Sequence, residues 1–302
     1  MKKAAFLFIA CLLFAGCDAP NALSLEPSPP AIESTTPSKQ GLIASPAITA
    51  TEPAIPVGSL EPVALTFPSM DGEMLSGTYY PPAKSNAPVV VLMHQYDMNQ
   101  HEWDAIALWL QNAPQKTPAQ NPVPSSPWLD ASWFPTLPAD FSVGVLTFTF
   151  RTCDNGCGKH LPAEWLLDAE AAMGQAASMP GVDLTSIVPI GTSIGADAAV
   201  DACNLTAPRS SLRCAGAMSL SPGSYLNMEY QKTVQELVDL GVPVLCFASE
   251  DDAPSAAACQ SVKAEGFTAS VDPGLAHGIR MVDPKQKTNV LLEIYDFLSG
   301  LQ

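Results

Sequence analysis

The stretch from Ser186 to Val200, SIVPIGTSIGADAAV, changes character half-way along its length. Its first residues are apolar and β-branched, which is typical of a buried strand, whereas its last residues are mostly alanines, which favour a helix. Ser193 stands between the two halves, with Gly191 before it and Gly195 after it. A serine on a tight strand-to-helix turn has a strained backbone, and neighbouring glycines remove side chains that would collide there. The stretch therefore predicts a hydroxyl that projects from a strand end, beside the positive end of a helix dipole.

Strand and helix patterns alternate along the rest of the chain. Strands are expected at 63–67, 74–80, 87–93, 143–150, 187–190, 215–220, 242–248 and 268–271, and helices at 101–111, 163–178, 196–203, 230–240, 255–264 and 288–298. The first two strands flank Asp71-Gly72, which is a hairpin turn signal. The alternation predicts an α/β protein with a mostly parallel, doubly wound sheet and an N-terminal β-hairpin. Functional loops of such sheets gather at the carboxyl ends of the strands, where 191–195 falls.

A serine hydroxyl is a weak nucleophile at neutral pH, so Ser193 needs a base and the base needs an orienting acid. The chain has four histidines, and His277 lies on the expected loop between the last strand and the last helix. The acid should follow the preceding strand, where Glu250, Asp251 and Asp252 stand together. The three functions thus occur in the order serine, acid, histidine.

On these residues the chain from about Val63 to its end resembles the α/β-hydrolases, and among them the dienelactone hydrolase-like and related esterase group. The matching pieces are VVVLMHQ, VGVLTFTFRT, LLDAEAAMGQAASMPGVDLTSIVPIGTSIG, VPVLCFASEDD and AHG. The resemblance implies the α/β-hydrolase fold for residues 63–302 and a serine hydrolase acting on a small-molecule carboxylic ester. It selects Asp252 as the acid, with Asp251 as the alternative. Dienelactone hydrolases themselves use a cysteine, so Ser193 points to ester hydrolysis through an acyl-enzyme.

The resemblance also implies an oxyanion hole formed by two main-chain N–H groups. One belongs to Ile194, directly after the nucleophile. The other follows the strand at 87–93, where the loop reads His94-Gln95-Tyr96, so that the N–H of Tyr96 is the candidate. Gln95 stands where the family usually has glycine, which leaves the shape of this loop open. His94 is expected to be structural and to bind loop backbone.

Two other functions stay open from the sequence. One is a serine peptidase of the same fold. The other is a catalytically inactive lipoprotein that binds a ligand or partner, which the altered loop at Gln95 keeps possible. Acidic residues outnumber basic ones by 30 to 14, for a net charge of −16, and this balance argues against nucleic acid as a partner.

No metal or cofactor is expected. Asp97, Asn99, His101 and Glu102 lie close together in the sequence, but their spacing matches no standard ligand pattern, and helix capping accounts for them.

The N-terminus carries the signs of export. Lys2 and Lys3 precede an apolar run at 4–15, which is too short to cross a bilayer as a mature helix. The small residues before Cys17 resemble a bacterial lipoprotein signal, which implies that residues 1–16 are removed and that Cys17 is lipidated. Residues 17–62 are rich in proline, serine, threonine and alanine, and this composition predicts a disordered tether. We therefore expect a domain anchored to a membrane on its extracytoplasmic side.

The cysteines agree with export. Of eight cysteines, Cys11 and Cys17 belong to the N-terminal segment, which leaves six. An even number is typical of disulfides in an oxidising compartment, and neighbours in the sequence suggest the pairs Cys153 with Cys157, Cys203 with Cys214, and Cys246 with Cys259. Other pairings stay possible, as does a metal site built from Cys153, Cys157 and His160.

Overall fold

The computed structural model describes residues 59–112, 131–207 and 212–301. The expected signal sequence (1–16), the Cys17 anchor and most of the expected tether (17–62) lie outside the described residues. In the described ranges, none of the helices is both long and apolar enough to cross a membrane.

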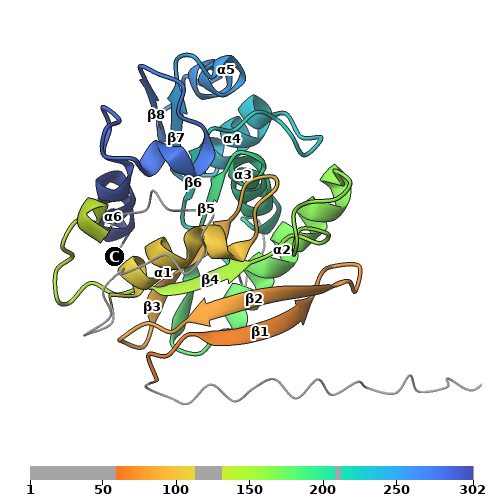
Figure 1. Cartoon of the computed structure of the whole chain (residues 1–302), viewed down its shortest axis with the longest axis vertical. Coiled ribbons are helices and arrows are strands. Elements are labelled where there is room, and N and C mark those ends of the chain that lie inside the picture. Colours follow the sequence, from red (N-terminus) through yellow and green to blue (C-terminus); the bar gives the residue numbers. More distant parts are fainter. Residues whose placement is uncertain (1–58, 113–130, 208–211, 302) are drawn as a thin grey trace, which may run out of the picture. The chain divides into compact units, whose positions relative to one another are not determined.

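The described residues form one eight-stranded sheet in the order β1-β2-β4-β3-β5-β6-β7-β8, with helices on both of its faces (Figure 1). The strands are β1 (Val63–Pro68), β2 (Met74–Tyr80), β3 (Ala87–Met93), β4 (Gly144–Phe148), β5 (Val182–Thr192), β6 (Ala217–Leu220), β7 (Val244–Ser249) and β8 (Phe267–Asp272). The α-helices are α1 (Asp104–Gln111), α2 (Pro162–Ser178), α3 (Ile194–Thr206), α4 (Tyr230–Asp239), α5 (Ala253–Ser261) and α6 (Val290–Gly300), and the 3-10 helices are η1 (Gln100–Trp103), η2 (Ala131–Trp133) and η3 (Gly278–Val282).

The sheet is mostly parallel, as the sequence predicts. β1 and β2 form the expected antiparallel hairpin, β2 is antiparallel to β4, and the other neighbouring strands are parallel. The register places Met93 of β3 level with Gly191 of β5, and Gly191 level with Ser219 of β6. The central strands therefore end together, and the loops that follow them meet at one edge of the sheet.

The sheet separates two hydrophobic cores, and β3 contributes to both. Its alternate residues Val89, Val91 and Met93 lie in the core under α2 and α3, while Val90 and Leu92 lie in the core on the side of α1 and α6. This strand is buried on both faces, which explains why its sequence is a continuous apolar run rather than an alternating one.

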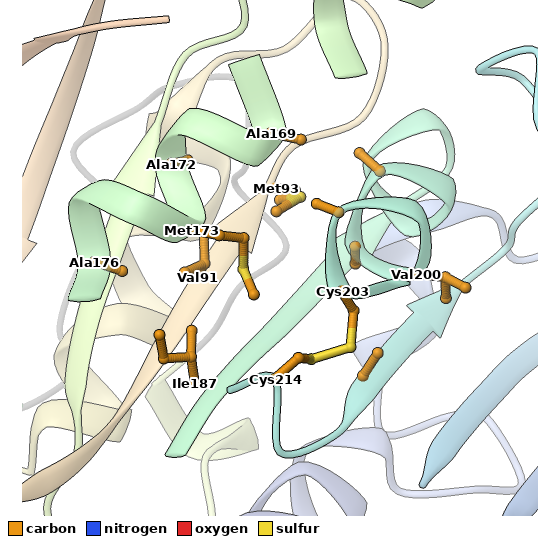
Figure 2. Close-up of a cluster of buried hydrophobic side chains, with 14 of the residues drawn as sticks. Val91, Met93, Ala169, Ala172, Met173, Ala176, Ile187, Val200, Cys203 and Cys214 are labelled. Atoms are coloured by element: carbon orange, nitrogen blue, oxygen red, sulfur yellow. A yellow bond between two sulfur atoms is a disulfide. The ribbon is translucent and has the colours of Figure 1, made fainter. Parts of the chain in front are cut away.

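Alanines allow α2 and α3 to pack closely on the sheet. Figure 2 shows Ala169, Ala172 and Ala176 on the face of α2 that is turned towards Val91 and Met93. Their spacing of three and four residues places all three on one side of the helix. Small side chains let the helix axis lie close to the strands.

Three disulfides lie within the described residues, and they join the cysteines in the pairs that their proximity in the sequence suggests. Cys203 at the end of α3 is bonded to Cys214 before β6 (Figure 2), Cys246 of β7 is bonded to Cys259 of α5, and Cys153 is bonded to Cys157 in the loop after β4. The thiolates of Cys153 and Cys157 are therefore not available for the alternative metal site with His160.

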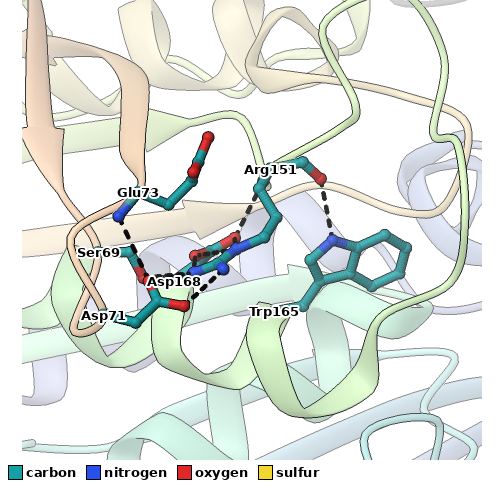
Figure 3. A network of polar contacts seen from close by, with 6 residues as sticks. All are labelled: Ser69, Asp71, Glu73, Arg151, Trp165 and Asp168. Carbon is teal, nitrogen blue, oxygen red and sulfur yellow. Dashed lines mark hydrogen bonds and ion pairs between the residues drawn. The ribbon is translucent and has the colours of Figure 1, made fainter.

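A network of charges joins the hairpin to α2 (Figure 3). The Arg151 guanidinium donates to Asp71 in the turn between β1 and β2, at 2.7 Å, and to the fully buried Asp168 of α2, at 2.6 Å. Trp165 donates its indole N–H to the main-chain oxygen of Arg151 at 3.0 Å. The Arg151 guanidinium also holds the pKa of Asp71 at about 2, well below its ordinary value. Asp168 thus has a structural role in joining α2 to Arg151.

Candidate active site

Ser193 lies on the turn between β5 and α3, in a conformation that side chains rarely adopt. Its φ is 50° and its ψ is −117°, and its side chain is nearly buried, with 9% of the residue exposed. The glycines on either side are required by contact. A Cβ on Gly191 would lie 1.9 Å from the Gly195 carbonyl oxygen, and a Cβ on Gly195 would lie 2.2 Å from the main-chain oxygen of Met93. The strained serine is held in place by the close packing of β3, β5 and α3.

Ser193, His277 and Asp252 form one chain of hydrogen bonds. The distance from His277 Nε2 to Ser193 Oγ is 2.8 Å, and the distance from His277 Nδ1 to Asp252 Oδ2 is 2.6 Å. A carboxylate only accepts hydrogen bonds, so Nδ1 carries the imidazole proton and Nε2 is free to accept the serine proton. Asp251 is exposed, and its main-chain N–H donates to the main-chain oxygen of Gly274. Asp252, and not Asp251, therefore contacts the imidazole.

The loop that carries His277 is fixed directly after the histidine. Gly278 has a φ of 58°, and its N–H donates to Ser221 Oγ at 3.0 Å. Ser221 follows β6, is fully buried and has a φ of 61°. The β6 loop thus supports the loop that carries the base.

The comparisons with known proteins bear on the fold. No protein-family model matches the sequence, and no curated protein does. The solved structures that are similar to it include the esterase Pf2001 of Pyrococcus furiosus, at 14% identity and a TM-score of 0.53, covering 80% of this chain and 93% of that one. A dienelactone hydrolase of Anabaena variabilis is similar at 13% identity and a TM-score of 0.54, and the match covers 80% of this chain and 97% of that one. The α/β hydrolase GrgF of a Penicillium species is similar at 15% identity and a TM-score of 0.54, and the match covers 80% of this chain and 99% of that one. The chain has the α/β-hydrolase fold.

In this α/β-hydrolase fold, the two expected oxyanion donors lie on segments that touch. The carbonyl oxygens of Met93 and His94, which precede Tyr96, would contact a Cβ on Gly195, which follows Ile194. Within the described part of the chain, neither the Ile194 N–H nor the Tyr96 N–H donates to a protein acceptor. Both N–H groups therefore remain the candidate oxyanion donors. The loop at Gln95 does not move these segments apart.

His94 holds the start of this loop, as the sequence predicts. It is fully buried, its Nδ1–H donates to the Gln95 oxygen at 2.8 Å, and its Nε2 accepts from the Phe150 N–H at 3.0 Å. Burial lowers the pKa of His94 to about 4, so the ring is neutral and keeps both bonds at neutral pH.

Glu102 has a place that the sequence analysis missed. Asn99 caps η1 by accepting from the His101 N–H, as expected, but Glu102 does not serve as a cap. Its side chain is buried and accepts from the Gln95 N–H at 2.8 Å and from the Thr192 hydroxyl at 3.2 Å. The available signal was an acid directly before Trp103, the first apolar residue of the expected helix, and such an acid is costly to bury unless it is hydrogen-bonded.

A cavity of about 390 Å³ lies beside the His277 loop. Its described lining consists of residues on both sides of that histidine: Leu275, Ala276, Arg280, Asp283 and Gln286. Within the three described ranges, no group of three or more histidine, cysteine or acidic residues is placed to hold a metal ion.

Proposed function

We propose that this protein is a serine hydrolase that hydrolyses small carboxylic esters through an acyl-enzyme on Ser193. One observation carries the proposal. The Ser193 hydroxyl, the His277 imidazole and the Asp252 carboxylate are joined by hydrogen bonds of 2.8 and 2.6 Å at the carboxyl edge of the sheet. This is the arrangement that activates a serine for acyl transfer.

The steps follow from these contacts. Ser193 Oγ attacks the ester carbonyl carbon while its proton passes to His277 Nε2, and the carboxylate of Asp252 stabilises the imidazolium. The N–H groups of Ile194 and Tyr96 bind the oxyanion of the tetrahedral intermediate. The C–O bond then breaks as His277 returns the proton to the leaving alcohol. A water molecule, deprotonated by His277, attacks the acyl-enzyme and releases the acid, which restores the Ser193 hydroxyl.

The fold and the nucleophile favour ester hydrolysis. Proteins that share this fold include ones named as esterases and one named as a dienelactone hydrolase. A serine in place of the cysteine of dienelactone hydrolases supports the esterase side of that group. A serine peptidase of the same fold is the alternative, and it differs by cleaving a dipeptide anilide.

The test uses the full-length protein and p-nitrophenyl acetate. Ser193→Ala should lower kcat by about 10⁵–10⁶-fold, and Asp252→Asn by about 10⁴-fold because it disturbs the tautomer of His277. Asp251→Asn is the matched control and should keep wild-type activity. A fluorophosphonate probe should label the wild type and not Ser193→Ala. Full activity in Ser193→Ala would overturn the proposal, and an unlabelled wild type without turnover would mean a binding protein instead.

We propose further that Cys17 carries a lipid that anchors the protein to a membrane on its extracytoplasmic side. The sequence Phe14-Ala15-Gly16-Cys17 after a short apolar run supports this placement. Three disulfides within the described residues support an oxidising compartment. The wild type should incorporate labelled fatty acid and fractionate with membranes, and Cys17→Ala should do neither. A wild type without label would exclude the anchor.

A further inference from the structure

We propose that Gln95 and Glu102 act as positioning residues, which together hold the loop that carries Tyr96 against both the nucleophile turn and the His277 loop. The inference rests on the proposed function, because it concerns the alignment of the oxyanion donor with the nucleophile and the base. Neither residue touches the reacting atoms in this arrangement.

Glu102 joins two segments of the site. Its Oε2 atom accepts both the N–H of Gln95, directly before Tyr96, and the hydroxyl of Thr192, directly before Ser193. The side chain is 1% exposed, and its other oxygen, Oε1, has no hydrogen-bond partner. Burial raises the pKa of Glu102 to about 8, although the two bonds act in the opposite direction. Burying an acid costs free energy, and the two hydrogen bonds that Glu102 accepts offset part of that cost.

Gln95 joins the same loop to a third segment. Its Oε1 atom accepts the N–H of Ile279 at 3.2 Å, across 184 residues of sequence. The amide lies so close to the next turn that a Cβ on Gly278 would be 2.1 Å from Gln95 Oε1. Gly278 therefore has to be a glycine for the Gln95 side chain to reach the loop. Gln95, which stands where the family usually has glycine, thus has a hydrogen-bond partner in Ile279.

The two residues form a continuous connection. The nucleophile strand, the Tyr96 loop and the His277 loop meet through Thr192, Glu102, Gln95 and Ile279. Misplacing a reacting group by about 1 Å can cost on the order of 10²-fold in rate. Loss of the connection should therefore lower kcat, while ground-state binding of a small ester should change little.

The experiment compares isosteric variants of the full-length protein on p-nitrophenyl acetate. Gln95→Met keeps the volume and removes the acceptor, and it should lower kcat by about 10–100-fold with KM changed by less than about 3-fold. Glu102→Gln keeps one oxygen acceptor for both donors, and it should retain kcat within about 3-fold. Glu102→Met removes that acceptor and should behave like Gln95→Met.

Gln111→Met is the matched control. Gln111 is also buried, and its amide donates to the oxygens of Leu60 and Pro81 rather than to the site. This variant should lose stability but keep kcat. If Glu102→Met fails to fold, Gln95→Met, whose position is half-buried, decides alone.

The outcomes separate the two proposals. Wild-type turnover that is abolished in Ser193→Ala establishes the hydrolase. If that result holds and Gln95→Met keeps wild-type kcat, or loses activity only through KM, the positioning role is overturned. A loss of kcat in Gln111→Met as large as in Gln95→Met would also overturn it, because the effect would then follow from stability alone.

Discussion

The short loop closed by Cys153 and Cys157 should matter more for activity than for stability. It packs against the loop that carries the proposed oxyanion donor. The Tyr96 hydroxyl donates to the Gly158 oxygen at 3.0 Å, and the Asp97 N–H donates to Cys157 Sγ at 3.3 Å. The Tyr96 ring also lies against Trp165, with ring centroids 5.9 Å apart. Opening the disulfide removes the support on this side of the Tyr96 loop.

The stabilities of the disulfides follow from the lengths of the loops that they close. Cys153 and Cys157 are 4 residues apart, and chain entropy predicts a contribution of about 2 kcal/mol. Cys203 and Cys214 are 11 residues apart, for about 3 kcal/mol. The latter pair joins the end of α3 to the start of β6, away from the carboxyl edge of the sheet. The Cys153–Cys157 bond therefore contributes less to stability but lies against the Tyr96 loop. The Cys203–Cys214 bond contributes more to stability but lies away from the site.

The assay pairs urea denaturation with kcat on p-nitrophenyl acetate. Alanine should replace each cysteine, because a serine hydroxyl at a buried position would lack a partner. Removing Cys153–Cys157 should lower the free energy of unfolding less than removing Cys203–Cys214, yet lower kcat by about 10-fold or more, while the other variant stays within about 2-fold. An unchanged kcat without Cys153–Cys157, or an equal loss in both variants, would refute the reasoning that this loop supports Tyr96.

Three further predictions concern single residues. Arg151→Met leaves the fully buried Asp168 without its cation, and it should lower the free energy of unfolding by about 3–5 kcal/mol in urea denaturation. The folded protein holds the Glu102 proton more tightly than the unfolded chain, since burial raises the pKa of Glu102 to about 8; stability in urea should therefore fall as pH rises from about 4.5 to 8, and Glu102→Gln should flatten that slope. Gly195→Ala places a Cβ 2.2 Å from a main-chain oxygen of β3, so kcat should fall by about 10²-fold or more, whereas Gly174→Ala in α2 meets nothing within 4 Å and should keep kcat.

Most of the sheet could be predicted because its strands are defined by local patterns. β2 and β3 have the expected bounds, and β5 differs by beginning at Val182 rather than at residue 187. The start of β5 is missed because it lacks the continuous apolar run of the buried part, and this end of the strand is largely exposed. The expected helix at 101–111 begins instead as the 3-10 helix η1 and becomes α-helical at Asp104. That tight turn is where Glu102 is drawn inwards to Gln95 and Thr192, a contact that local propensity does not contain.

The convergence of Ser193, Asp252 and His277 could also be predicted, and the reason is topological. Parallel strands place their carboxyl ends at one edge, so residues after β5, β7 and β8 must converge whatever their distance in sequence. The resemblance selected Asp252 over Asp251, and the structure places Asp252 against His277. The residue pattern alone leaves the two open, because neighbouring residues in a loop point in different directions. The Gln95–Ile279 contact was beyond sequence reasoning for a different reason. It joins two irregular loops through one side chain, and no period or turn signal marks such a pair.

Helix α3, which begins directly after Ser193, is also linked to the loop that carries His277. Asp197 of α3 is buried and accepts the main-chain N–H groups of Gly223 and Tyr225. The same loop contains Ser221, whose hydroxyl accepts the N–H of Gly278 directly after His277. A shift of α3 would therefore carry the nucleophile turn and the support of the base in the same direction. Gln95 also contacts the His277 loop, at Ile279, so two contacts in adjacent residues hold this loop directly after the histidine.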